Sequence, residues 1–432
     1  MKYYLFIDNF RGFHDTSIPI TDVNFLVGEN STGKTSLLGL LKLLSSPNFL
    51  MGQDFGDEHV GFTHFSDMVS AHSHDPSYFR IGFASETQDG RRKGNGSKLL
   101  GSLFTFIEKE GQPKLFKCTF CRGGDKITLR FGKFIYYKRE RCSPASTVQE
   151  LLSALRDQWV SEHASHDVGY KKLHAPRGLP ILVALSFASS EPQKPDEFII
   201  YPPEEAFFQP DLTWLAPIRT KPKRTYDELT LDFSPEGQHT PYLIRRILNS
   251  KSQVTRFKAF IERVGKASGL FQDVRIRRFG RGATARFELD IVIDDKPINV
   301  LNVGYGVSQS LPVLVELLAR TRGSWFAVQQ PEVHLHPRAQ AALGDVLFEM
   351  AAQDRKRFLI ETHSDFMIDR FRMNYKRTRA DNPDSQILFF ERRDKHNVIT
   401  PIPIGKSGEL AVSQPESYRQ FFIREQMDLL GI

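Results

Sequence analysis

The chain has 432 residues, of which 40% are hydrophobic, and it carries a formal net charge of +7. This apolar content is sufficient for a sizeable core, and the length predicts about two or three domains. No run of about 18 apolar residues is present, which excludes an evident membrane-spanning helix. Three cysteines cannot build a disulfide framework, so we expect a cytoplasmic protein with no membrane partner.

The chain begins with two expected strands, residues 2–8 and 17–27, joined by the turn Asn9-Phe10-Arg11-Gly12-Phe13. The second strand leads into the segment Gly28-Glu29-Asn30-Ser31-Thr32-Gly33-Lys34-Thr35-Ser36, and a leucine-rich helix follows. This is the pattern G-x-x-x-x-G-K-[ST] in the strand–loop–helix context that binds nucleotide phosphates. Glycines allow backbone N–H groups to curl around phosphate oxygens, and the helix N-terminus adds positive charge.

The residue types of this loop predict how it binds ATP and Mg²⁺. Lys34 is expected to reach the β- and γ-phosphates, and the hydroxyl of Thr35 is expected to hold Mg²⁺. The other nucleotide-binding residues expected in the loop are Asn30, Ser31, Thr32, Gly33 and Ser36.

Residues 1–145 are expected to form the first part of a nucleotide-binding head. After the loop, β-rich alternation predicts strands at 80–85, 99–108, 113–121 and 125–138. Residues 89–98 are basic and glycine-rich, which is typical of a hairpin tip. The front of the chain therefore predicts a mixed β layer beside the nucleotide loop.

Residues 146–278 have a different character and are interpreted as an insertion. Helices are expected at 147–163 and 240–267, strands at 181–187 and 197–201, and a proline-rich irregular segment at 215–226. Between Arg219 and Arg281 there are 15 Lys or Arg and 6 Asp or Glu, a local charge of +9. This basic stretch is either a solvated face or a surface for nucleic acid or an acidic partner.

Residues 279–432 return to an α/β pattern. Strands are expected at 286–293, 325–329, 357–361 and 386–391, and helices at 308–320, 337–352 and 364–373. Three polar motifs stand at element ends: Val303-Gly304-Tyr305-Gly306-Val307-Ser308, then Gln329-Gln330-Pro331-Glu332-Val333-His334-Leu335-His336-Pro337, then Glu361-Thr362-His363-Ser364.

In this order the motifs resemble those of the ABC-type AAA ATPases of the SMC/RecF/OLD class. The resemblance implies an α/β fold, an ABC-type P-loop NTPase head with a mixed β layer and a largely helical insertion. It also implies that Arg11 contacts nucleotide and that His363 senses the γ-phosphate. Gly304, Gly306 and Ser308 would lie in a signature-like loop that binds the nucleotide of a second subunit, so we expect a head-to-head homodimer or a higher homo-oligomer.

The chain departs from this class in the motif after the strand at 325–329. The class places an acidic residue for Mg²⁺-bound water at position 329 and often a catalytic glutamate at 330, whereas this chain has Gln329 and Gln330. Glutamine can orient water but cannot act as a carboxylate base. Glu332 is the nearest carboxylate, and we expect slow hydrolysis with Glu332, Gln330 and His363 as the catalytic residues and Gln329 beside the metal.

Two other motifs have an ordinary structural explanation. Cys118 and Cys121 have the spacing of half a zinc site, but we expect both to lie in a β hairpin. His334 and His336 resemble a metal-binding pair, but we expect them to be structural or to contribute to the dimer contact.

Two further segments, residues 408–430 and the motif Leu215-Ala216-Pro217-Ile218-Arg219, resemble those of stand-alone ATPases from anti-phage systems such as Septu and PARIS. This implies a sensor or scaffold subunit that controls a separate nuclease, of HNH or Toprim-like type, in response to DNA or a phage protein. The first alternative is a RecF-like repair ATPase that binds DNA through the basic stretch. The second is a non-catalytic, nucleotide-gated interaction module.

Overall fold

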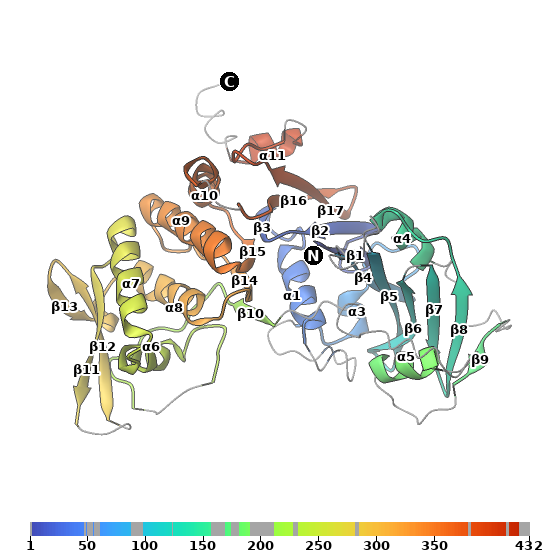
Figure 1. The fold of residues 1–432 in the computed structure, drawn as a ribbon, viewed down its shortest axis with the longest axis horizontal. Coiled ribbons are helices and arrows are strands. Elements are labelled where there is room, and N and C mark those ends of the chain that lie inside the picture. The colour runs from blue at the N-terminus through green and yellow to red at the C-terminus, as the bar shows by residue number, and fades with distance from the viewer. Residues whose placement is uncertain are drawn as a thin grey trace, which may run out of the picture. The chain divides into compact units, whose positions relative to one another are not determined.

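The computed structural model describes residues 2–46, 49, 55, 61–87, 98–122, 124–156, 169–173, 181–190, 211–227, 232–280, 285–378, 382–411 and 414–422. The chain divides into two compact units (Figure 1). The first comprises Met1–Thr21, Glu29–Asp211 and Phe390–Ile399, and the second comprises Asp22–Gly28, Leu212–Phe389 and Thr400–Ile432. No described helix is long and apolar enough to cross a membrane.

An eight-stranded sheet in the order β2-β1-β4-β5-β6-β7-β8-β9 forms the first unit, and its neighbouring strands are antiparallel. Its strands are β1 (Lys2–Asp8), β2 (Thr16–Ile20), β4 (Tyr78–Thr87), β5 (Lys98–Lys109), β6 (Gln112–Arg122), β7 (Asp125–Phe131), β8 (Ile135–Arg141) and β9 (Lys171–Lys172). Strands β4 to β8 are neighbours in chain order and antiparallel, so they form a meander.

Apolar side chains cover the sheet of the first unit on both faces. Helix α4 (Val148–Leu155) packs Leu151 and Leu155 against Gly101 of β5, where a larger residue would collide with both leucines. Phenylalanines form a second cluster, in which Phe79 stacks on Phe106 with ring centroids 5.1 Å apart. The remaining helices of this unit are α1 (Lys34–Leu44), α3 (Phe65–Met68) and α5 (Ile181–Ser190).

The second unit is built on a six-stranded sheet in the order β10-β14-β15-β3-β16-β17. Its strands are β10 (Leu212–Leu215), β14 (Trp325–Gln329), β15 (Arg357–Glu361), β3 (Val23–Gly28), β16 (Ser385–Arg393) and β17 (His396–Ile404). The first four are parallel to one another, and β3 and β14 are buried along their whole length. Burial on both faces is why these strands are continuous apolar runs in the sequence.

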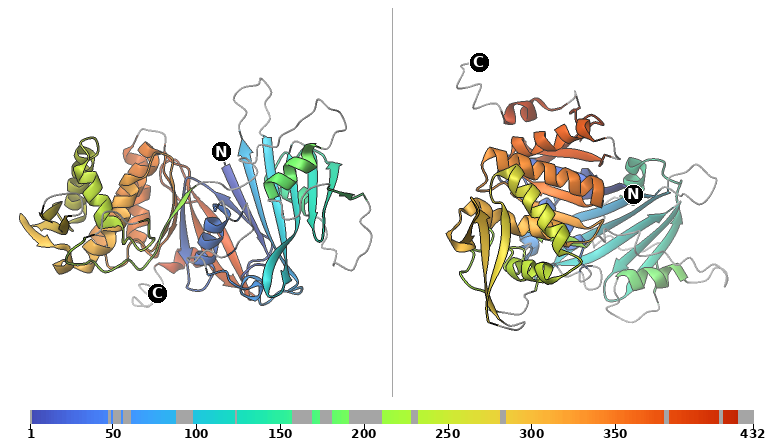
Figure 2. Two further views of the ribbon diagram at one scale, coloured as in Figure 1. Left: turned by 90° about the horizontal axis from the view of Figure 1, so that it is seen from below. Right: turned by 60° about the vertical axis from the view of Figure 1, so that its left-hand side comes forward.

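Helices and a small antiparallel sheet surround this six-stranded sheet. The helices are α6 (Thr240–Asn249), α7 (Val254–Ser268), α8 (Tyr305–Ala319), α9 (Pro337–Asp354), α10 (Asp365–Arg377) and α11 (Glu416–Phe421), with a 3₁₀ turn η2 (Val300–Asn302). Helix α7 runs beside α9 (Figure 2). The small sheet has the order β11-β12-β13, with β11 (Asp273–Phe279), β12 (Arg286–Ile293) and β13 (Lys296–Asn299).

Several expected elements were wrong in type or extent. The run 181–187 is not a strand but part of α5, in which Ile181, Ala184, Leu185 and Ala188 are buried at helical spacing. The expected strands 17–27 and 125–138 are each two strands, and the expected helix 240–267 is two helices.

Three other expectations fall wholly or partly outside the described residues. The expected strand 197–201 lies entirely outside them, as does most of the hairpin tip at 89–98. The expected helix 147–163 is described only as far as residue 156, and there it forms α4.

Candidate functional site: a P-loop and a buried polar sheet edge

The phosphate-loop motif joins β3 to α1, as the sequence predicts. Ser31 and Gly33 have φ angles of 62° and 95°, so the backbone curls twice through a left-handed conformation before the helix. A Cβ atom on Gly33 would lie 2.4 Å from Cζ of Phe13. Position 33 therefore requires glycine for its conformation and for the approach of the Phe13 ring.

The side chain of Lys34 is buried against this loop. The residue is 3% exposed, and its Nζ donates to the carbonyl of Glu29 at 2.6 Å. The hydroxyl of Thr32 donates to the same carbonyl at 2.7 Å. Helix α1, all of which is described, has no side-chain cap and no acidic residue in its first turn. Its N-terminus thus retains the partial positive charge that suits a phosphate.

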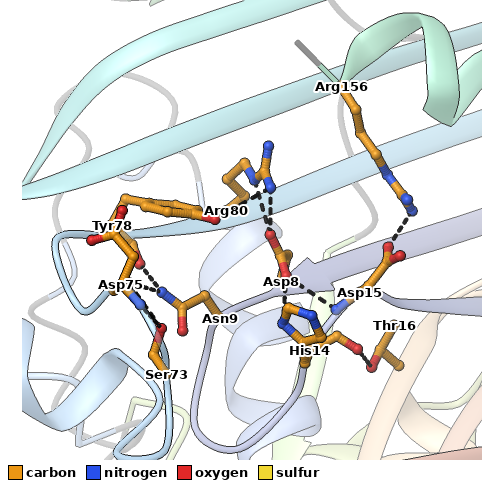
Figure 3. A network of polar contacts seen from close by, with 10 residues as sticks. All are labelled: Asp8, Asn9, His14, Asp15, Thr16, Ser73, Asp75, Tyr78, Arg80 and Arg156. Atoms are coloured by element: carbon orange, nitrogen blue, oxygen red, sulfur yellow. Dashed lines mark hydrogen bonds and ion pairs between the residues drawn. The ribbon is translucent and has the colours of Figure 1, made fainter. Parts of the chain in front are cut away.

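The turn at residues 9–13 is held rigidly beside the loop. Phe10 and Phe13 are fully buried and exchange backbone hydrogen bonds of 3.1 and 2.8 Å. Figure 3 shows how the flanking residues are fixed: Arg80 donates to Asp8 at 2.7 Å, and the amide of Asn9 donates to the carbonyl of Asp75 at 2.8 Å.

Arg11, which is expected to contact nucleotide, is held by the segment 61–67. Its Nε donates to the carbonyl of Asp67 at 2.8 Å, and its Nη2 donates to that of Gly61 at 3.2 Å. The guanidinium lies 4.5 Å from the centre of the Phe62 ring. Burial lowers the pKa of Arg11 from its ordinary value, and Asp67 opposes this decrease.

In the second unit, four parallel strands end at the same edge of the sheet. Leu215 of β10 pairs with Val328 of β14, and Gln329 pairs with Glu361 of β15. Strand β3 follows β15 in the sheet and ends at Gly28, where the phosphate loop begins. In open α/β sheets, ligands bind outside the carboxyl ends of the strands, so this edge is the candidate site.

Gln329 lies against a carboxylate that the sequence analysis did not single out. Its Nε2 donates to Oε2 of Glu361 at 3.1 Å, and both residues are buried. Gln330 follows with a φ of 41°, and its backbone N–H donates to the carbonyl of Glu361 at 2.8 Å. An acidic residue at position 329 would face a second carboxylate, whereas the amide of glutamine forms a hydrogen bond with it.

Glu332 connects this edge to the proposed switch histidine. Its Oε1 accepts the backbone N–H of His363 at 2.7 Å, but no described residue hydrogen-bonds to Oε2. Burial raises the pKa of Glu332, and the N–H of His363 and the positive charge of Arg219 oppose the increase. The imidazole of His363 is exposed, while Ser364 caps α10 by accepting the N–H of Met367 at 3.1 Å.

The signature-like loop lies at the start of α8. Gly304 is the exposed N-cap residue, and a Cβ there would meet no atom within 4 Å. Gly306 approaches the neighbouring turn closely, because its Cβ would lie 2.9 Å from the carbonyl oxygen of His334. Ser308 is buried in the first turn and donates to the carbonyl of Tyr305 at 3.1 Å. The geometry thus exposes Gly304 and Tyr305 more than Ser308.

Arg219 is a polar residue of this edge that the sequence analysis left without a site role. It follows β10 and is 3% exposed, and its Nη2 donates to the carbonyl of Gln329 at 3.1 Å. Burial lowers the pKa of Arg219 to about 10, although the negative charge of Glu332 raises it. An arginine four residues after the end of an apolar strand was the available signal, because a buried arginine has to find a polar partner.

The basic stretch 219–281 is partly neutralised by acidic neighbours. Arg256 pairs with Asp354 at 2.8 Å, Lys258 with Asp273 at 2.7 Å, and Arg263 with Glu349. Arg277 pairs with Glu288 of β12. These pairs reduce the positive charge that this stretch can offer to nucleic acid.

The cysteine and histidine motifs lie on a strand and beside a helix start. Cys118 and Cys121 both lie buried on β6, and no cluster of three or more metal-binding side chains occurs among the described residues. His336 caps α9, and the ring of His334 lies 5.6 Å from that of Tyr305.

A family model described as "AAA domain, putative AbiEii toxin, Type IV TA system" matches residues 23–369, from the start of β3 into α10. The chain belongs to this family. Membership supports the expected class, an ABC-type AAA ATPase with an α/β P-loop fold. No curated protein matches the chain significantly.

Solved structures that match the chain include heads of SMC proteins. A head bound to the C-winged helix domain of ScpA has 12% identity and a TM-score of 0.43, covering 94% of this chain and 98% of that one. A *Pyrococcus furiosus* head with an extended coiled coil, bound to the C-terminal domain of ScpA, has 11% identity and a TM-score of 0.41, with coverage of 100% and 99%. The *Thermotoga maritima* SMC head has 11% identity and a TM-score of 0.36, with coverage of 92% and 97%.

The AAA-domain family implies bound ATP and Mg²⁺. Mg²⁺ prefers carboxylate, phosphate and water oxygens, and the polar edge offers the carboxylate of Glu361 hydrogen-bonded to Gln329. The residues therefore fit a cation held mainly by phosphate oxygens and water. Thr35 and Gln329 stay predictions as protein ligands of the ion, which would neutralise charge on the transferred phosphate.

Proposed function

We propose that the protein binds ATP, hydrolyses it slowly, and uses ATP occupancy to control a separate nuclease subunit in an anti-phage defence complex. The observation that carries this proposal is the pairing of a complete phosphate loop with glutamine at both positions 329 and 330. Lys34 and the uncapped start of α1 favour tight phosphate binding. The two glutamines remove the carboxylates that would otherwise make turnover fast.

The buried carboxylate of Glu361 supports retention of Mg²⁺ in spite of Gln329. It supplies one negative charge at the same sheet edge, one strand away from the position where the class has its acidic residue. We propose that Glu361 provides the electrostatic support for the cation that Gln329 lacks.

A second copy of the chain is the proposed partner at the signature-like loop. Tyr305 is 55% exposed and Leu301 is 45% exposed, and both large apolar side chains flank the open Gly304. Exposed apolar side chains around a loop of this kind favour an interface. We propose that ATP joins two heads here and that the change in assembly is transmitted to the nuclease, of HNH or Toprim-like type.

The defence role also has support from the family description, which names a putative toxin of a toxin–antitoxin system. The DNA-repair alternative rests on the basic stretch, and the ion pairs of Arg256, Arg263 and Arg277 weaken it. A trigger such as DNA or a phage protein would act on the assembled complex.

The test measures mass by light scattering with and without ATP and Mg²⁺, together with phosphate release. We expect an ATP-dependent or constitutive oligomer and turnover far below the ~10 s⁻¹ of a median enzyme. Lys34→Ala is the matched control that should remove nucleotide binding. A monomer with fast turnover that DNA accelerates would instead support the repair function. Deletion of a candidate nuclease partner gene tests the partnership, and defence that stays intact after the deletion would contradict it.

A further inference from the structure

Two of the three cysteines lie side by side in the first unit. The Sγ atoms of Cys121 and Cys142 are 3.5 Å apart, although the residues are separated by 21 positions in the chain. All three cysteines are free thiols. A disulfide bond requires a sulfur–sulfur distance of about 2.05 Å, so the two atoms have to approach by about 1.5 Å to become bonded.

The topology of the sheet brings Cys142 to Cys121 across an intervening strand. Cys121 is the last residue but one of β6, and Arg141, which ends β8, pairs with Asp125 of β7. The chain then passes the turn between β6 and β7, where the N–H of Cys142 donates to the carbonyl of Gly124 at 2.8 Å. A Cβ atom on Gly124 would lie 3.0 Å from the carbonyl oxygen of Cys142. The backbone of Cys142 is therefore held closely against this turn.

The two thiols have different environments. Cys121 is 3% exposed and belongs to the apolar layer that includes Leu151 and Leu155 of α4. Cys142 is partly exposed and belongs to neither a helix nor a strand. Burial, together with the hydrogen bond to Cys142, raises the pKa of Cys121 to about 12, so this thiol stays protonated at neutral pH. Cys142 is thus the sulfur that a small oxidant in solution reaches first.

Cys118 lies on the same strand but faces the other side of the sheet. Residues three positions apart on a β-strand point to opposite faces. Cys118 is fully buried, and burial raises its pKa well above the ordinary value. It therefore serves as an internal reference that should not react.

We propose that Cys142 and Cys121 are a peroxide-sensitive pair that closes to a reversible disulfide. The thiolate of Cys142 attacks one oxygen of hydrogen peroxide and the O–O bond breaks. The other oxygen leaves as hydroxide and takes up the proton that Cys142 has lost, which gives water and a sulfenic acid on Cys142. Sγ of Cys121 then attacks Sγ of Cys142, the S–O bond breaks, and the leaving hydroxide takes the proton of Cys121 as a second water. One peroxide is reduced by two electrons while two thiols are oxidised to one disulfide.

The bond would tie the segment that leads into α4 to strand β6, and a thiol reductant would release it. The segment after β8 is irregular, so it can shift by the distance that the bond requires. This inference does not depend on the proposed ATPase function.

The test treats the purified full chain with hydrogen peroxide, blocks the remaining thiols with an alkylating agent, and maps its peptides by mass spectrometry without reduction. We expect a cross-link within one chain between Cys121 and Cys142, with a loss of about 2 Da that dithiothreitol reverses. Cys118 and Cys121 share the tryptic peptide 118–122, so fragment spectra and variants assign the bond.

Three variants distinguish the roles of the cysteines. Cys121→Ala should lose the cross-link and retain a sulfenic acid on Cys142 that dimedone traps, whereas Cys142→Ala should lose both the cross-link and the dimedone adduct. Cys118→Ala is the matched control and should form the cross-link to the same extent as the wild type.

Four outcomes would overturn the inference. In the first, Cys142 of the wild type accumulates the dimedone adduct without forming the cross-link. In the second, the cross-link joins two chains. In the third, Cys118→Ala loses the cross-link. In the fourth, Cys142 stays reduced at a peroxide concentration that oxidises Met373, whose side chain is exposed.

Melting temperatures show whether the folded sheet accommodates the bond. Closing a loop between residues 21 positions apart constrains the unfolded chain, so the oxidised wild type should melt roughly 5–10 °C above the reduced protein. Cys142→Ala treated in the same way should show no such rise, and it corrects for oxidation of methionines. If peroxide raises the melting temperature of the wild type no more than that of Cys142→Ala, the folded sheet does not accommodate the bond and the inference is wrong.

Discussion

Restoring an acidic residue at position 329 should destabilise the protein, although the ABC-type class favours such a residue there. In Gln329→Glu, the hydrogen bond of 3.1 Å to Glu361 becomes a contact between two carboxylates at a buried sheet edge. Two unit charges that relax to ~5 Å repel by about 3 kcal/mol at an effective dielectric constant of ~20. The repulsion should raise the pKa of the introduced carboxyl by about 2.

The sign of the pH dependence follows from this increase. The pKa of the introduced carboxyl is higher in the folded state than its ordinary value of about 4.3, so the unfolded state loses its proton first as the pH rises. The stability deficit of Gln329→Glu should be absent near pH 4 and complete above about pH 6.5. A divalent cation between the carboxylates should reduce the deficit, so we expect Mg²⁺ to raise the melting temperature more in the variant than in the wild type.

Thermal unfolding from pH 4 to 8, with and without Mg²⁺, measures these effects. At pH 8 without Mg²⁺ we expect the variant to melt roughly 5–10 °C below the wild type. The double variant Gln329→Glu/Glu361→Gln is the matched control. It moves the carboxylate from position 361 to position 329 on the adjacent strand, so the edge still has one carboxylate and one amide. It should melt near the wild type. If Gln329→Glu is as stable as the wild type at pH 8, the carboxylate of Glu361 does not face position 329 and the reasoning is wrong.

Further predictions concern the loop, the motif after β14 and the switch histidine. Gly33→Ala should destabilise the first unit by about 1–3 kcal/mol and weaken ATP binding, because the new methyl group meets the Phe13 ring at a φ of 95°; unchanged melting and ATP titration would contradict this. Lys34→Ala should abolish ATP binding in a calorimetric titration without unfolding the protein, and retained affinity would assign the phosphates to other residues. Gln330→Glu should speed phosphate release if the missing carboxylate at position 330 limits the rate of hydrolysis. If Glu332 already acts as the base, the rate of phosphate release should change little. His363→Ala should leave ATP affinity intact and slow phosphate release, because the residue is exposed and is the predicted sensor of the γ-phosphate.

The proposed ATPase site would combine phosphate binding with weak support for hydrolysis. Lys34 and the uncapped start of α1 suit a phosphate, whereas Gln329 and Gln330 at the end of β14 carry amides. Glu361 adds a carboxylate at the same sheet edge from the neighbouring strand β15. Such an arrangement suits a protein in which the lifetime of bound ATP determines the state of a complex.

The sequence by itself determined the phosphate loop, most strands and the order of the motifs. The strand, loop and helix around Lys34 could be predicted because the motif is local, and its glycines and lysine act through their own backbone and side chain. The parallel strands β14 and β15 were also predictable, since burial on both faces produces continuous apolar runs. The family match over 23–369 agrees with this assignment.

Only the tertiary structure decided which distant polar residues meet. The pairing of β10 with β14 brings Arg219 to the carbonyl of Gln329, and the pairing of β14 with β15 places Glu361 beside the amide of Gln329. Strand order and register are set by long-range packing, which no local pattern encodes. The helix at 181–190 was misjudged for a related reason, because a short apolar run fits either a strand or a helix until its neighbours determine which side chains are buried.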